Sequence, residues 1–327
     1  MEALDLPLVT IITPSYNQGL YLDATIRSVL EQDYPHIEYI IIDGGSTDES
    51  QAVIQRYADR LAYWESMPDR GQAHAVNKGL QRARGEILGW LNSDDLLAPG
   101  AVSQAMQAFQ DQPEIDVVYG RLARIDAAGR LVPTPLLPKD RIVFDRAHVI
   151  GECIVNQPGA FWRRDIMQQV GWLDESLTYS LDYEYWSRMA LAGARFKRLD
   201  KVVAFFRLSE GSKTVSQTAA MAVEQFHTLE HIVRRVNENN LPPSPGTTSP
   251  ETSDLAYHLD IPAAQVEWQA RQVRARIALR AAYGYAKLHN WPETRHWLSV
   301  ALHNDPAALL ERRYFDLALA SLRRRLM

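Results

Sequence analysis

The chain has 327 residues, enough for one large domain and a smaller one. Hydrophobic residues make up 46% and charged residues 23%, as in ordinary globular proteins, and the formal net charge of −5 excludes a general electrostatic attraction to nucleic acid. A phosphate-bearing ligand would therefore be bound by local features: a metal ion, a helix N-terminus or a few basic side chains.

Cys153 is the only cysteine, so no intrachain disulfide can form, and we expect a cytoplasmic protein. The first residues lack the basic and apolar regions of a signal peptide. No run approaches about 18 consecutive apolar residues, the length that spans a bilayer. We therefore expect any membrane contact to be peripheral, at the inner face of the membrane.

The first 95 residues alternate between strand and helix patterns. Short β-branched or apolar runs predict strands at residues 8–13, 37–43, 62–65 and 85–92. Apolar residues at helical spacing predict helices at residues 19–31, 48–57 and 71–83, the second capped by Ser46. This alternation indicates an α/β fold with a mostly parallel sheet and helices on both faces.

The rest of the chain divides at about residue 214. Before it, the sequence predicts a hairpin at 116–133, a helix at 182–193, and two strands within 195–208 around Asp200-Lys201. After it, helical patterns flank a Pro/Ser/Thr-rich loop at 237–254. We therefore predict a domain at 1–214, with halves at about 1–95 and 96–214, and an all-helical extension at 215–327.

The last predicted helices resemble a single tetratricopeptide-like hairpin. Single repeats are unstable alone, so we expect the extension to pack on the first domain or to join two copies in a homo-oligomer. Arg323 to Arg325 read as a solvated helix end, with a weak contact to an anionic membrane as the alternative.

Polar residues follow three of the predicted strands, at Ser15–Asn17, Asp43–Asp48 and Asn92–Asp95. In sheets of this kind, ligands bind beyond the carboxyl ends of the strands. The sequence therefore places a ligand site at that edge of the sheet.

Five motifs occur in order: PSYN (14–17), IDGGSTDES (42–50), DRGQAHAVNKG (69–79), NSDD (92–95) and LDYEYW (181–186). With them the chain resembles the family-2 glycosyltransferases over about residues 8–214. The resemblance implies an A-type, Rossmann-like fold and an inverting, hexosyltransferase-type reaction. It also implies a UDP- or dTDP-sugar donor, and a glycan or glycolipid acceptor in the assembly of surface polysaccharide or glycolipid.

The NSDD segment predicts a metal site. A divalent cation bound by a carboxylate can neutralise the charge of a departing nucleoside diphosphate. The family pattern is D-x-D, and Asp94 stands at its third position, so we expect Asp94 to bind Mn²⁺ or Mg²⁺. Asn92 or Asp95 would contact the ribose or a metal-bound water, and Ser93 is a further candidate for a contact with the donor. The alternative is a capped loop without a ligand.

The loop after the second strand is predicted to bind the base of the donor. The resemblance implies that Asp43 accepts a hydrogen bond from the imide N–H of uracil or thymine, and that Pro14, Tyr16 and Asn17 line the pocket. Many relatives have D-D-G here, whereas this chain has D-G-G and lacks the second carboxylate.

Further donor contacts are predicted from two segments. By resemblance, Asp69, Arg70, Gly71, Gln72 and Asn77 meet the donor, with a phosphate contact from Arg70 or Lys78. The alternative for these two cations is a solvated basic face. Near the end of the domain, Arg207 and Lys213 are further candidates for a phosphate contact.

The acceptor hydroxyl is a poor nucleophile and requires a general base. By resemblance we expect that base to be Asp182, at the start of a helix, with Glu184 as its rival. Asp182 could instead be a helix N-cap. Phe161 and Trp162 are predicted to form an acceptor wall by stacking on sugars, and either could instead belong to the core.

Two other functions compete with glycosyl transfer. A nucleotidyltransferase shares the doubly wound sheet, but it would carry a Gly-rich basic loop after the first strand, where this chain has PSYNQGL. A non-catalytic interaction protein could be built around the C-terminal helices. The presence of Asp43, Asp94 and Asp182 argues against it.

Overall fold

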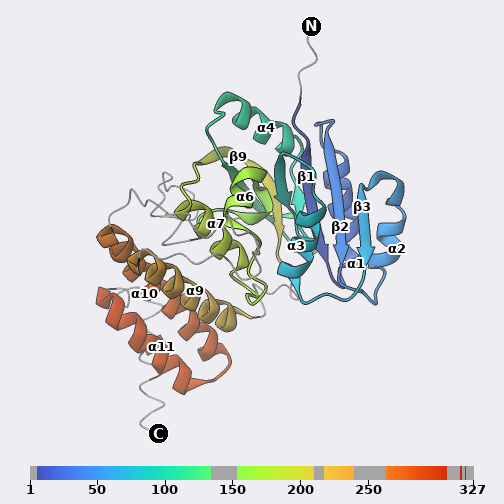
Figure 1. Cartoon of the computed structure of the whole chain (residues 1–327). Coiled ribbons are helices and arrows are strands. Elements are labelled where there is room, and N and C mark those ends of the chain that lie inside the picture. Colours follow the sequence, from blue (N-terminus) through green and yellow to red (C-terminus); the bar gives the residue numbers. More distant parts are fainter. Residues whose placement is uncertain are drawn as a thin grey trace.

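The computed structural model of the chain describes residues 6–133, 153–209, 217–238 and 263–307, together with Leu317, Ala318 and Ser321 (Figure 1). Within these residues a nine-stranded sheet has the order β3-β2-β1-β4-β8-β6-β9-β5, and β7 pairs with β6. The predicted α/β architecture is thus confirmed.

The first four strands form the parallel half of the sheet. They are β1 (Val9–Ser15), β2 (Ile37–Asp43), β3 (Tyr63–Ser66) and β4 (Ile87–Trp90). The helices between them are α1 (Gly19–Leu30), α2 (Ser50–Gln55) and α3 (Gln72–Arg82), and a 3-10 turn lies at Ala58–Arg60. Ser15 pairs with Asp43, which pairs with Ser66, so the polar carboxyl ends of β1, β2 and β3 lie side by side.

The second half of the sheet is mixed. Its strands are β5 (Leu96–Leu97), β6 (Val117–Ile125), β7 (Leu131–Val132), β8 (Ala160–Arg163) and β9 (Phe196–Arg207). Antiparallel β8 joins β4 to β6, and β6 is parallel to β9. The helices of this half are α4 (Ala101–Asp111), α6 (Arg164–Val170) and α7 (Leu181–Leu191), with a 3-10 turn at Gln157–Gly159.

Two local predictions need correction. Residues 195–208 do not form two strands: β9 is continuous, and the residues between Arg198 and Val202 bulge out where the register with β6 shifts. The Asp200-Lys201 pair therefore marks a bulge and not a turn. Ser46 does not cap α2, because that helix begins at Ser50 and the Ser46 hydroxyl binds Asp43.

The sheet is buried on both faces, as the apolar runs in its strands require. One core cluster packs α1, α2 and α4 against one face, and a second packs α3, α6 and α7 against the other. Strand residues alternate between the two: Ile11 and Ile41 belong to the first cluster, and Ile12 and Ile40 to the second.

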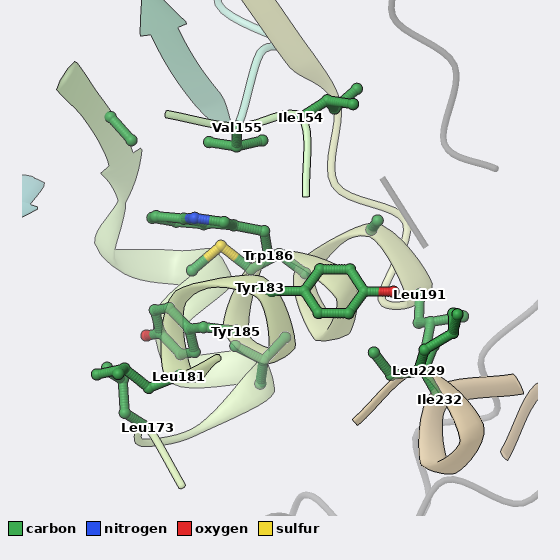
Figure 2. Packing of buried hydrophobic residues seen from close by; sticks show 14 of the residues in the cluster. Ile154, Val155, Leu173, Leu181, Tyr183, Tyr185, Trp186, Leu191, Leu229 and Ile232 are labelled. Atoms are coloured by element: carbon green, nitrogen blue, oxygen red, sulfur yellow. The ribbon is translucent and has the colours of Figure 1, made fainter. Parts of the chain in front are cut away.

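The extension consists of α9 (Thr218–Glu238), α10 (Ala263–Lys287) and α11 (Trp291–Asn304). Figure 2 shows Tyr183 and Leu191 of α7 near Leu229 and Ile232 of α9, and all four are buried in the same core cluster. The extension therefore packs on the first domain through α7. In the described part of the chain, we find no helix with the length and apolarity needed to cross a bilayer.

Candidate active site

The candidate site begins at the end of β4, where Asn92 to Asp95 follow the buried Trp90. The Thr25 hydroxyl of α1 donates to the backbone oxygens of Ser93 (2.9 Å) and Asp95 (2.8 Å), which fixes this loop against the first helix. Ser93 is buried, so its predicted donor contact could only come from the backbone. The loop is held from behind and presents its carboxylates at the edge of the sheet.

Asp94 and Asp95 are adjacent and have different surroundings. The Asp95 side chain is buried; its Oδ1 accepts the Arg207 N–H at 2.9 Å, while Oδ2 has no hydrogen-bond partner among the described residues. Burial, and then the charge of Asp94, raise the pKa of Asp95 well above its ordinary value. Burial also raises the pKa of Asp94, which is half-buried. The pair is therefore poorly solvated when ionised.

Asn92 joins the β4 end to two other elements. Its Oδ1 accepts from Trp90 Nε1 at 2.9 Å and from Gln72 Nε2 at 2.8 Å, and its Nδ2 donates to Gln157 Oε1 at 3.0 Å. Gln157 in turn donates to the Trp90 carbonyl at 2.7 Å. Gln72 and Asn92 are thus hydrogen-bonded to each other, and no sequence pattern indicated that Gln157 completes the network.

Arg207 braces the same loop and does not point into solvent. It is 4% exposed; its Nε donates to the Asp94 carbonyl at 2.8 Å and its Nη1 to the Asp126 carbonyl at 3.1 Å, and its guanidinium lies over the ring of Tyr21. This geometry does not fit the predicted phosphate contact, because the side chain is occupied and buried. Lys213, the other candidate, lies outside the described residues.

Asp43, at the end of β2, is completely buried and satisfied by its own surroundings. Its carboxylate accepts from the Ser46 N–H (2.8 Å), the Ser46 hydroxyl (2.5 Å) and the Ser66 hydroxyl (2.6 Å). The predicted contact between this carboxylate and the base does not fit, because a ligand cannot reach a side chain with no exposed surface. Asp43 instead shapes the loop.

Asp69 occupies the space beside Gly44, the position where many relatives have a second carboxylate. A Cβ atom on Gly44 would lie 2.8 Å from Asp69 Oδ2. Asp69 Oδ1 accepts the Gly71 N–H at 2.8 Å, and the side chain is partly exposed. A carboxylate that comes from a different loop therefore stands next to the D-G-G turn.

The loop after β1 carries the remaining predicted base contacts. Pro14 is buried within the strand, whereas Tyr16 is 62% exposed. Asn17 adopts a positive φ of 50°, and its Oδ1 accepts the Thr47 N–H at 2.9 Å, which ties this loop to the one after β2. Asn tolerates this left-handed conformation better than most residues. Tyr16 is thus the exposed aromatic ring at this edge.

An open cleft of about 760 Å³ adjoins the same loop. Its lining includes Asn17, Tyr21 and Asp48 on one side and the β6–β7 turn from Asp126 to Arg130 on the other. The sequence indicated that turn only as a hairpin, since its closeness to Asn17 depends on the tertiary fold.

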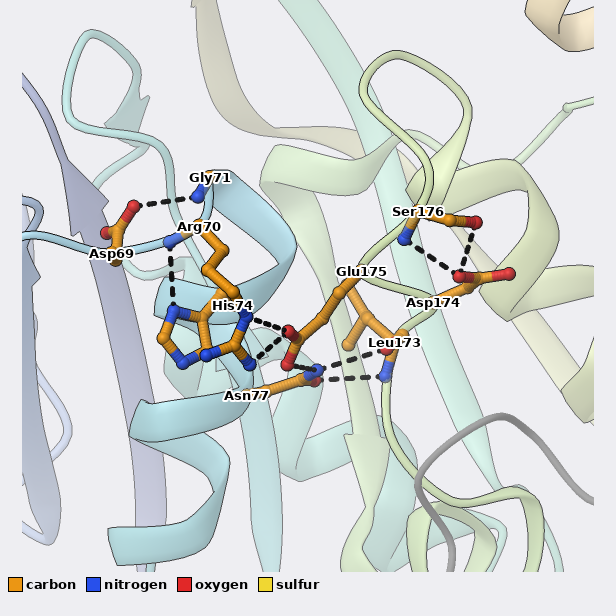
Figure 3. Close-up of polar contacts among 9 residues, drawn as sticks. All are labelled: Asp69, Arg70, Gly71, His74, Asn77, Leu173, Asp174, Glu175 and Ser176. Carbon is orange, nitrogen blue, oxygen red and sulfur yellow. Dashed lines mark hydrogen bonds and ion pairs between the residues drawn. The ribbon is translucent and has the colours of Figure 1, made fainter.

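A polar network joins α3 to the loop after α6 (Figure 3). Asn77 Nδ2 donates to the Leu173 carbonyl and Asn77 Oδ1 accepts the Leu173 N–H, both at 3.0 Å. Asn77 Nδ2 and the Arg70 guanidinium also donate to the carboxylate of Glu175. Asn77 is buried, so it fastens two segments and offers no group to a donor.

The two predicted phosphate-binding cations of this region are both paired with carboxylates. Arg70 pairs with Glu175, and Lys78 Nζ lies 2.6 Å from Glu65 Oε1. Arg70 remains exposed and could exchange partners, but Lys78 is held against β3. The alternative of a solvated basic face fits Arg70, which is exposed, but not Lys78.

Asp182 lies in the first turn of α7 and is half-buried. Its Oδ1 accepts the Tyr183 N–H at 2.7 Å, and Cys153 Sγ lies 4.0 Å from its Oδ2. The N-cap position belongs to Ser180, so Asp182 is not the cap. Trp186, one turn further along, stacks on Trp90 at a centroid distance of 6.4 Å, which places this helix beside the end of β4.

Glu224 of α9 anchors the chain just before α7. Its carboxylate accepts the N–H groups of Tyr179 (2.7 Å) and Ser180 (2.8 Å) and the Ser180 hydroxyl (2.9 Å). A negative charge at a helix N-terminus is favourable. The extension therefore helps to position α7, a role without a local sequence signal because the partners are more than 40 residues apart.

Glu184, predicted on the acceptor side as the rival base, and the two rings of the predicted acceptor wall are all buried. Glu184 is 6% exposed and its Oε1 accepts from Arg188 at 2.7 Å; Arg188 also donates to the carbonyls of Val170 and Trp172. Phe161 and Trp162 are 2% and 0% exposed in β8. The structure therefore places both rings in the core, so they do not form a stacking wall, and it gives Glu184 a structural ion pair.

Comparison with known proteins identifies the family. Residues 10–171 match the model of "Glycosyl transferase family 2". An uncharacterised glycosyltransferase of Mycobacterium tuberculosis is 31% identical over 191 residues, which are 57% of this chain and 70% of that protein. The chain belongs to glycosyltransferase family 2. An uncharacterised glycosyltransferase of Rickettsia typhi is 27% identical over 261 residues, 76% of this chain and 79% of that protein.

Solved structures agree on the fold of this family-2 enzyme. The mannosyltransferase PcManGT of Pyrobaculum calidifontis, in complex with GDP-Man and Mn²⁺, matches with a TM-score of 0.57 and 19% identity over 95% of this chain and 88% of that one. S. aureus TarS 1-349 in complex with UDP-GlcNAc matches with a TM-score of 0.55 and 18% identity over 89% of this chain and 90% of that one. The family and the fold together identify the protein as a glycosyltransferase.

Proposed function

We propose that this enzyme is a metal-dependent, inverting glycosyltransferase of the hexosyltransferase type, with a UDP- or dTDP-sugar donor. The observation that carries the proposal is the end of β4, where Asp94 and the unpartnered Oδ2 of Asp95 lie together at the carboxyl edge of the sheet. Surface polysaccharide or glycolipid assembly is the setting that the family resemblance favours.

The carboxylates at the β4 end fit a divalent cation. One buried carboxylate oxygen has no partner among the described residues, and burial raises the pKa of both acids, so a hard cation with oxygen ligands would stabilise the ionised pair. The described residues contain no cluster of three or more Asp, Glu, His or Cys, so Asp94 would hold the cation with Asp95 beside it, and donor phosphates and water would add ligands. When bound, the cation neutralises charge on the leaving diphosphate.

We assign the contact with the nucleobase of the donor to Asp69, in place of Asp43, which the sequence analysis predicted. Asp43 is buried, whereas Asp69 is partly exposed beside Gly44 and its Oδ2 faces the position of the missing second carboxylate. Asp69 can accept a hydrogen bond from the imide N–H of uracil or thymine. The exposed ring of Tyr16 offers a face for stacking the same base.

Asp182 takes the role of general base. It removes the proton from the acceptor hydroxyl, and the oxygen forms a bond to the anomeric carbon. The bond from that carbon to the diphosphate oxygen breaks on the opposite side, and its electron pair leaves with the nucleoside diphosphate. Ser180, Glu224 and the stack of Trp186 on Trp90 hold the first turns of α7 in place for this step.

The substitution Asp182→Asn tests this assignment. Loss of a general base lowers the rate by about 10²- to 10⁴-fold, whereas nucleotide-sugar binding should be unchanged because the base contacts the acceptor. Transfer rates and donor binding by calorimetry measure the two effects. Glu184→Gln is the matched control and should lower thermal stability, because it weakens the buried pair with Arg188. Near-normal turnover in Asp182→Asn, with a folded but inactive Glu184→Gln, would transfer the role to Glu184.

A further inference from the structure

One face of α10 carries an ordered row of exposed side chains. Trp268, Gln272, Arg276, Arg280, Tyr283 and Lys287 are all exposed and follow one another at intervals of three or four residues. We call these six residues the α10 row. The adjoining side of the helix is covered, with Val266, Ala270, Val273 and Ile277 buried in the core. The row extends over 19 residue steps, or about 28 Å of helix.

The α10 row has a charge opposite to that of the whole chain. The helix contains four arginines and one lysine but only one acid, Glu267, so its formal charge is five minus one, or +4, compared with −5 for the protein. Glu267 pairs with Arg274, at the side of the helix next to Glu230 of α9. The other cations, Arg271, Arg276, Arg280 and Lys287, are exposed.

Large aromatic rings stand among these cations. Trp268 is 62% exposed near the start of α10 and Tyr283 is 45% exposed near its end, with Lys287 Nζ 4.7 Å from the Tyr283 ring centroid. Leu288 is 69% exposed directly after the helix. Tryptophan and tyrosine beside basic residues favour the headgroup region of a bilayer, where the ring is partly buried and its polar atom stays hydrated.

We propose that the α10 row docks the enzyme on an anionic lipid surface, with the axis of α10 parallel to the membrane plane. Charge complementarity supplies the attraction, because Arg276, Arg280 and Lys287 place three cations in the row, which contains no acid. The two rings add the apolar part of the contact. Because α9 packs on both α10 and α7, docking at this face would hold the catalytic domain at the membrane surface. The docking itself does not depend on the donor or on the base assignment.

The test is co-sedimentation of the full-length enzyme with vesicles of phosphatidylcholine, with and without phosphatidylglycerol. We expect binding only to the anionic vesicles. Replacing Arg276, Arg280 and Lys287 together by Gln should lower the partition coefficient by about two orders of magnitude, since each basic residue contributes about five-fold. Trp268→Ala should lower it further and should be detectable at high salt, where charge attraction is screened.

A control variant with the same change in charge replaces Arg60, Arg195 and Lys201, exposed cations outside the extension. It should keep its affinity for the anionic vesicles, and all variants should keep the wild-type melting temperature. Equal losses in the two triple variants would overturn the proposal, because net charge alone would then explain binding. Absence of vesicle binding by the wild type, or binding to a single-stranded oligonucleotide in its place, would also overturn it.

Discussion

Two strands of this sheet are followed by aspartates at the same edge, and the carboxylates of these aspartates differ in their hydrogen bonding. Asp43, after β2, is buried and receives three short hydrogen bonds from Ser46 and Ser66. Asp95, after β4, is equally buried, but one of its carboxylate oxygens has no partner among the described residues, and its neighbour Asp94 is half-buried. Residue type and burial are thus the same for Asp43 and Asp95, and only their hydrogen bonding differs.

The difference separates a structural carboxylate from one suited to a ligand. A buried carboxylate whose oxygens are all bonded to protein groups stabilises a loop and has no capacity left for a ligand. A buried oxygen without a partner costs free energy in the unliganded protein and gains a partner when a cation binds. This contrast can be tested by replacing each acid by the amide of the same shape.

The largest expected effect is that of Asp94→Asn on transfer. Removing the charge that binds the cation should lower the transfer rate by about 10²- to 10³-fold, corresponding to several kcal/mol of charge stabilisation. The metal-free variant should melt at the wild-type temperature or above it, because burial raises the pKa of Asp94 and its ionised form is therefore disfavoured in the fold. Transfer assays with manganese and thermal melts without it measure both outcomes. Unchanged activity in the variant, or full wild-type activity in excess chelator, would exclude Asp94 from metal binding.

The second largest effect is a loss of stability, which we expect in the variant Asp43→Asn. One amide nitrogen would replace a carboxylate oxygen and would face the Ser46 N–H or a serine hydroxyl, so that at least one buried donor loses its acceptor. This should lower the free energy of unfolding by about 1–3 kcal/mol. Urea denaturation measures that loss. The manganese-induced rise in melting temperature should survive in this variant, and its disappearance would mean that Asp43 also belongs to the metal site.

Much of this edge could be predicted from the sequence, because strand patterns and strand ends are local. The runs before Ser15, Asp43 and Asn92 predicted the parallel strands that place these residues together, and the ordered motifs predicted the family. Hydrogen-bond partners could not be predicted in the same way. The Asp43 carboxylate accepts a hydrogen bond from Ser66 of another strand. Arg207, which donates to Asp95 at the end of β4, is 112 residues away in the sequence.

The predictions that failed also depended on contacts between residues that are distant in the sequence. Phe161 and Trp162 have the composition of a sugar-stacking wall, but β8 lies between β4 and β6, which buries both of its faces. Similarly, Asp200-Lys201 has the composition of a turn, but continued pairing with β6 on both sides makes it a bulge. Both outcomes depend on the strand order in the second half of the sheet, which a mixed topology does not reveal in sequence.

The smallest expected effect is a pH dependence at the β4 end. Burial raises the pKa of Asp94, and burial together with the Asp94 charge raises that of Asp95. For an acid whose pKa is higher in the folded state, the stabilising contribution is fully present below the unfolded pKa, about 3.9 for Asp. That contribution is lost as the pH rises through the pKa of the folded state, because the unfolded chain then releases its proton first.

A cation binds the ionised form, so the manganese-induced rise in melting temperature should grow as the pH rises from about 5 to about 8, by an amount equivalent to about 1 kcal/mol. Thermal melts with and without manganese at each pH measure this change, and Asp94→Asn should show a flatter profile. A manganese effect equal at both ends of the range would show that proton release and cation binding are not coupled at this pair.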